Sequence, residues 1–125
     1  MNTTNKIDYW RTGSDEDWEV AVDLIQRGKL RHGLFFLHLS LEKILKAHVC
    51  RVTEEDPPKI HNLLRLMQRA NLALDVQQSK LLAELNSYCL EGRYATELGP
   101  PPSPEEAART VRQAEEVRTW LIRRL

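Results

Sequence analysis

Residues 35–47 read FFLHLSLEKILKA, and their apolar side chains recur with the spacing of an α-helix. At 100° per residue, one arc of such a helix carries Phe35 together with Leu34, Leu41, Leu45 and Val49. The pattern extends on both sides and predicts a helix from about residue 31 to 52. This helix would be about 30 Å long at 1.5 Å per residue and would place its apolar arc against a core.

Three polar residues interrupt this arc. His38 lies near its middle, Glu42 lies about 40° away, and Lys46 lies further round. A histidine and a carboxylate that face a core cost free energy unless each finds a hydrogen-bond partner. They form either a structural network, with Glu42 bonded to His38 and Lys46, or the wall of a polar pocket between helices. The sequence leaves both interpretations open.

The opposite arc of this helix combines small residues with one aromatic residue. Phe36, Ser40 and Ala47 share this face, which would suit a partner helix. We interpret this face as a weak indication that the protein forms an oligomer.

Capping residues and breakers predict four further helices. Ser14 with Asp17 resembles a capping box, and Gly28 can end the first helix. The other expected starts are Asp56, Asp75 and Ser103, the last followed by Pro104 and Glu106. We expect the third helix to stop near Asn71 and the fourth, whose core face includes Val76, to stop at Gly92.

No segment alternates apolar and polar residues as a half-buried strand would. We therefore predict an all-α fold, a four- to five-helix up-and-down antiparallel bundle. Because 125 residues suffice for one core and not for two, residues 14–125 are expected to form a single domain, with residues 1–13 as a lead-in.

The composition favours an ordinary globular protein, with 42% hydrophobic and 29% charged residues. Basic and acidic residues number 18 each, so no overall positive field attracts nucleic acid. The apolar runs are too short to span a membrane, and the N-terminus lacks the apolar core of a signal peptide. Cys50 and Cys89 lie in apolar helical stretches, which indicates reduced thiols and a cytoplasmic protein. His32 and His48 are expected at or near the surface.

Two further segments follow the first in a characteristic order. Residues 57–67 read PPKIHNLLRLM, and residues 85–94 read LNSYCLEGRY. The order of a histidine, EKxLKA, a proline-flanked HxLxxL and an arginine–tyrosine pair resembles the HEPN domain family over residues 10–94. The resemblance implies a helical bundle that associates with minimal nucleotidyltransferases and helps to form their nucleotide or substrate cleft. The matching positions are His38, Glu42, Lys46, His61, Asn86, Arg93 and Tyr94.

One branch of this superfamily consists of ribonucleases, in which an arginine is followed after four to six residues by a histidine. After Arg93 the corresponding positions are Leu98, Gly99 and Pro100, so the histidine is absent. The family also tends to continue the arginine–tyrosine pair with a proline and an acidic residue, whereas this chain has Ala95 and Thr96. We therefore do not expect the chain to be an enzyme by itself.

The favoured interpretation is a binding module that forms a homodimer and pairs with a small nucleotidyltransferase in a toxin–antitoxin-like system. The seven matching residues would line a polar cleft, in which Arg93 would bind a nucleotide phosphate and Tyr94 would stack on an aromatic ring of the ligand. His61 alternatively bonds only to local backbone. No cofactor or metal is expected, since neither an HExxH pattern nor a cysteine pair is present. Two alternatives are an atypical ribonuclease that uses Arg93 with His38 or His61, and a structural adaptor without a small ligand.

Overall fold

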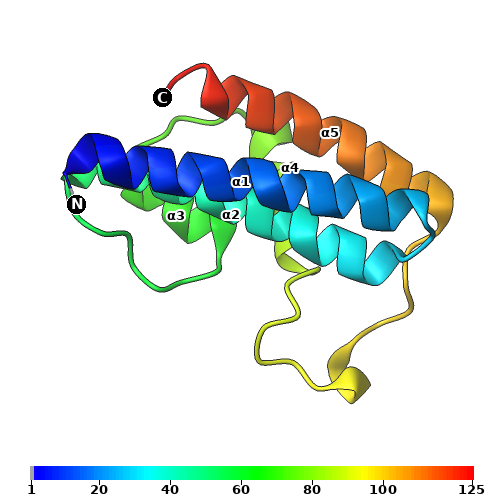
Figure 1. The fold of residues 1–125 in the computed structure, drawn as a ribbon. Coiled ribbons are helices and arrows are strands. Elements are labelled where there is room, and N and C mark those ends of the chain that lie inside the picture. Colours follow the sequence, from blue (N-terminus) through cyan, green and yellow to red (C-terminus); the bar gives the residue numbers. More distant parts are fainter. Residues whose placement is uncertain (1) are drawn as a thin grey trace.

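The computed structural model describes residues 2–125, and all regular structure within this range is helical (Figure 1). The long helices are α1 (Thr3–Gln26), α2 (Leu30–Thr53) and α5 (Pro104–Ile122). The shorter ones are α3 (Leu63–Arg69), α4 (Val76–Asn86) and a 3-10 turn, η1 (Ala95–Glu97). The predicted all-α bundle is confirmed.

Helix α2 is the centre of the bundle, because every other α-helix packs against it. Helices α1 and α2 lie side by side and run in opposite directions, while α5 crosses above them and returns toward the start of α1 (Figure 1). The side chains of Leu34, Leu41 and Leu45 are fully buried, as their shared arc predicts. Gly33 allows α1 to come close, since a Cβ atom there would lie 2.4 Å from Cγ1 of Ile25.

The opposite arc of α2 packs against α1. The hydroxyl of Ser14 donates to the carbonyl oxygen of Ser40 at 2.7 Å, and the hydroxyl of Ser40 donates to the carbonyl oxygen of Ser14 at 2.8 Å. Ala47 is also fully buried. Ser40 and Ala47 are therefore buried within this chain, while Phe36 on the same face is half-buried, and the oligomer stays a prediction.

The predicted start of the first helix at Ser14 is wrong. Helix α1 begins at Thr3, where the side chain of Asn2 accepts a hydrogen bond from the Asn5 amide at 2.8 Å. Ser14 resembles a cap in sequence, but its side chain is fully buried and bonds to α2 instead. A short hydroxyl residue suits a close helix contact as well as a helix start, and the sequence does not distinguish these uses.

Two other predicted starts are confirmed. Asp75 and Gln78 form a reciprocal capping box at the start of α4. The hydroxyl of Ser103 accepts a hydrogen bond from the Glu106 amide at 3.1 Å, with Pro104 in the first helical position. The bounds of α2 also differ by only one residue at each end from the prediction.

The region between α2 and α4 departs from the prediction. Helix α3 begins at Leu63 with Asn62 as its cap, whereas Asp56 forms an ion pair with Lys6 at 3.3 Å. Helix α4 stops at Asn86, before Gly92. Val76, expected to face the core, is the first residue of α4 and is 68% exposed.

His48, expected near the surface, is fully buried. Its Nε2 donates to the carbonyl oxygen of Leu121 at 2.8 Å, because the last turns of α5 lie over this part of α2. Burial lowers the pKa of His48 below 6.5. Both cysteines are free, Cys50 buried and Cys89 half-buried, and burial raises the pKa of each thiol.

No helix in residues 2–125 combines the length and the apolar character needed to cross a membrane.

Candidate functional site

Three polar side chains of α2 lie one turn apart and are almost inaccessible to water. His38, Glu42 and Lys46 are 0%, 4% and 6% exposed. The Lys46 ammonium lies 3.0 Å from Oε2 of Glu42 and 5.2 Å from the centre of the Trp10 ring. The buried carboxylate and ammonium therefore neutralise one another, and the indole adds a cation–π contact.

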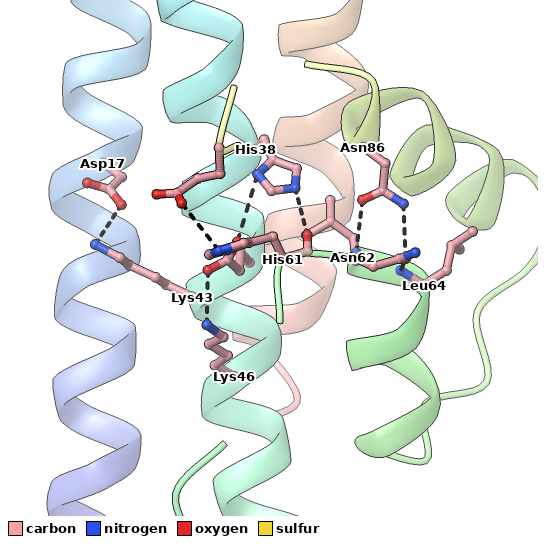
Figure 2. Close-up of polar contacts among 11 residues, drawn as sticks. Asp17, His38, Lys43, Lys46, His61, Asn62, Leu64 and Asn86 are labelled. Atoms are coloured by element: carbon pink, nitrogen blue, oxygen red, sulfur yellow. Dashed lines mark hydrogen bonds and ion pairs between the residues drawn. The ribbon is translucent and has the colours of Figure 1, made fainter. Parts of the chain in front are cut away.

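His61 reaches this pair from the segment between α2 and α3 (Figure 2). Its Nδ1 donates to Oε1 of Glu42 at 2.9 Å. Because a carboxylate oxygen only accepts, the proton must be on Nδ1. The other ring nitrogen, Nε2, is 3.6 Å from Oε2 of Glu91, and the side chain is 42% exposed. His61 is thus held from the inside by a buried carboxylate and presents its second nitrogen at the surface.

His38 holds the backbone of His61. Its Nε2 donates to the carbonyl oxygen of His61 at 2.9 Å, while its Nδ1 has no hydrogen-bond partner and lies 3.9 Å from Oε1 of Glu42. Burial lowers the pKa of His38 more than the neighbouring Glu42 carboxylate raises it. A neutral His38 with its proton on Nε2 fits this geometry. Its hydrogen bond to the carbonyl oxygen helps to position His61.

Asn86 joins the same region from the end of α4. Its Oδ1 accepts from the Leu63 amide at 2.9 Å, and its Nδ2 donates to Oδ1 of Asn62 at 3.1 Å. These bonds tie the first turn of α3 to the last turn of α4. Asn62 is absent from the predicted site residues, although an asparagine directly before an apolar helical run is a typical N-cap signal.

Within residues 2–125, Arg93 and Tyr94 form no hydrogen bond or ion pair with these residues. Both follow α4, where Arg93 donates to the carbonyl oxygen of Ser87 at 2.9 Å and Tyr94 is 76% exposed. The structure therefore brings together five of the seven predicted residues: His38, Glu42, Lys46, His61 and Asn86. We call these five residues the polar cluster.

The polar cluster offers one titratable group to a ligand, the His61 imidazole, because its other ionisable members are buried. Within residues 2–125, no group of three or more histidine, cysteine or acidic side chains is arranged to hold a metal ion. The arrangement can accept a hydrogen bond at Nε2 of His61 or, when that atom is protonated, donate one.

Comparison with known proteins identifies the class of this bundle. The HEPN domain model matches residues 7–125. The chain belongs to the HEPN domain family.

Two solved structures share the fold. The crystal structure of TT1696 from Thermus thermophilus superposes with a TM-score of 0.79 at 17% identity, covering 97% of this chain and 99% of that one. The crystal structure of ST0689, an archaeal HEPN homologue, gives a TM-score of 0.71 at 16% identity, covering 94% and 96%. None of the curated proteins matches the chain significantly. At these identities the likeness concerns the fold alone.

Proposed function

We propose that this HEPN domain is a binding module that pairs with a small nucleotidyltransferase and contributes a polar surface to the joint substrate cleft. HEPN domains commonly pair with such enzymes. The two proteins would form a toxin–antitoxin-like system in which this chain acts as a homodimer and presents His61 to its partner.

The observation that carries the proposal is the 2.9 Å bond between His61 and the buried Glu42. Removing a carboxylate and an ammonium from water costs several kcal/mol per ion before their attraction is counted. Apolar residues would fill the same volume at lower cost. The charged pair therefore supports a functional use, which is to hold His61 in one tautomer with Nε2 directed outward. A donor group of the partner or its nucleotide would bind there.

Affinity purification from the native cells, followed by mass spectrometry, tests the pairing. We expect a nucleotidyltransferase to co-elute in stoichiometric yield with the wild-type chain. His61→Gln should reduce this yield at least tenfold, because it removes the outward imidazole nitrogen while an amide can still donate to Glu42. Glu19→Gln, which changes an exposed side chain of α1, is the control.

Elution of the wild-type chain without a nucleotidyltransferase would overturn the proposal. Equal yields of the nucleotidyltransferase with the wild type and with His61→Gln would show that His61 is not part of the interface.

A further inference from the structure

The outer face of α5 carries a straight row of exposed polar residues. The inner face of this helix is mostly apolar and packs on the bundle, and α5 lies at the edge of the bundle (Figure 1). On the outer face, exposed residues recur at alternating intervals of four and three, which is the spacing of the contact seam between two packed helices. At 100° per residue they stay within an arc of about 80°. These residues, here called the α5 stripe, are Glu105, Arg109, Arg112, Glu116, Thr119 and Arg123.

The charges of the α5 stripe are not paired within the chain. Between residues 2 and 125, none of its glutamates or arginines forms an ion pair. Arg112 and Glu116 stand four residues apart, a spacing at which side chains of one helix can pair, and yet they do not. The side chains of the stripe are therefore available to a partner.

The α5 stripe is bordered by two hollows of the surface. The first, of about 730 Å³, lies between α4 and the stripe and is lined by Arg109 and Glu116 of the stripe. The second, of about 560 Å³, is lined by Arg112 and Glu116 among others. Trp120 contributes to the walls of both. The long side chains of a second helix laid along the stripe would have room in these hollows.

The order of charges along the α5 stripe is complementary to a second copy of the same helix in the opposite direction. In that arrangement Glu105 faces Arg123 of the partner subunit, and Arg112 faces Glu116 of the partner subunit. The third pair of positions joins an arginine to a threonine, so no like charges meet along the stripe. A two-fold axis repeats both ion pairs, because each copy presents the same surface to the other.

Other arrangements of two such helices bring like charges together. A parallel pair places every residue of the stripe opposite its own copy, so glutamate meets glutamate and arginine meets arginine. An antiparallel pair displaced by one heptad in one direction places Glu105 opposite Glu116, and displacement in the other direction places Arg112 opposite Arg123. Repulsion between like charges disfavours these alternatives. The charge order therefore specifies one orientation and one register.

We propose that two copies of this chain associate through the α5 stripe, antiparallel about a two-fold axis that passes near Ala114. Each exposed ion pair contributes little by itself, so the association is reversible and the chain is monomeric in dilute solution. The inference rests on the proposed function for the existence of a homodimer and names its interface. The stripe shares no residue with the polar cluster, so one chain can use both surfaces.

Sedimentation equilibrium of the full chain over a range of concentrations tests the interface. We expect the wild type to dimerise reversibly, and more weakly as NaCl rises from about 50 to about 500 mM. Arg112→Glu and Glu116→Arg should each weaken dimerisation by about tenfold, because two-fold symmetry turns two attractive contacts into repulsive ones. Arg11→Glu makes the same change of charge at an exposed position of α1 and should leave the dissociation constant unaltered.

An equimolar mixture of Arg112→Glu and Glu116→Arg is the decisive sample. The glutamate introduced in one chain then faces the arginine introduced in the other, and the native Arg112 and Glu116 that remain face each other. We expect this mixture to dimerise about as strongly as the wild type. Such a rescue requires both variants to be folded, so it separates loss of the contact from loss of the fold.

A dimer that neither substitution weakens would overturn the α5 interface and leave the homodimer to another face. A mixture no stronger than the single variants would overturn it as well. A wild type that stays monomeric at every concentration would overturn both the interface and the homodimer. Capture of the nucleotidyltransferase is measured separately, so the proposed pairing stands or fails on its own result.

Discussion

Glu42 receives a hydrogen bond on each carboxylate oxygen, one from His61 and one from Lys46, although only 4% of the residue is exposed. Such a pair adds little net stability compared with apolar residues of similar size, but loss of one member leaves the other charge buried alone. The stability of this region therefore depends on both members being present.

Glu42→Gln should lower the free energy of unfolding by about 3 kcal/mol, because the Lys46 ammonium then lacks its anion. Adding Lys46→Met should recover part of this loss, since the unpaired charge is removed. Urea denaturation measures both variants, with the exposed Glu19→Gln as a control that changes stability by less than about 0.5 kcal/mol. A similarly small effect of Glu42→Gln would show that the pair is not energetically coupled.

For single residues, the sequence predicted the contacts of the site that lie within one helix. The contacts of Glu42 with Lys46 and His38 follow from a separation of four residues on one helix. The contact with His61 spans 19 residues and depends on the path of the chain between α2 and α3. Helical periodicity contains no information about that path.

The helices differ in how clearly the sequence marks their ends. Asp75 and Ser103 cap the helices that they were predicted to start, because each precedes an apolar pattern at the correct spacing. Ser14 has the same chemistry but contacts α2 and α5, where Arg118 Nε donates to its hydroxyl oxygen at 3.1 Å. A cap is a local signal, whereas a helix contact depends on a partner that is distant in sequence.

Arg118 joins α5 to α1. Its guanidinium bonds to Ser14 and to Asp15, and it lies 5.4 Å from the centre of the Trp18 ring. Arg118→Met keeps the apolar stem and removes these bonds, so we expect it to cost about 1–3 kcal/mol. Arg112→Met, an exposed change on the same helix, should stay within about 0.5 kcal/mol. Equal melting temperatures for the two variants would show that Arg118 does not help to hold α5 in place.

The stability of the whole molecule should depend on two buried histidines. Burial lowers the pKa of both His38 and His48 from the ordinary value of 6.5. Below that value the unfolded chain binds protons that the folded chain still excludes. Their contribution to stability is therefore fully present above about pH 6.5 and is lost as the pH falls toward their folded values.

We expect the urea midpoint to decrease between about pH 7 and pH 5. His48→Gln should reduce this pH dependence whatever its effect on absolute stability, because one of the two titrating groups is gone. His32→Gln, which changes an exposed histidine, should leave the slope unaltered. A midpoint independent of pH in the wild type would contradict a neutral, buried state for both histidines.

The reciprocal bonds between Ser14 and Ser40 also have a kinetic consequence. They join two helices that are neighbours in sequence and connected only by residues 27–29. Chains rich in contacts between such neighbours lose little loop entropy before the contacts form, and they fold quickly. The α1–α2 hairpin should thus assemble before α5 docks on it. In stopped-flow experiments, Ser14→Gly would then mainly slow folding, whereas Arg118→Met would mainly accelerate unfolding.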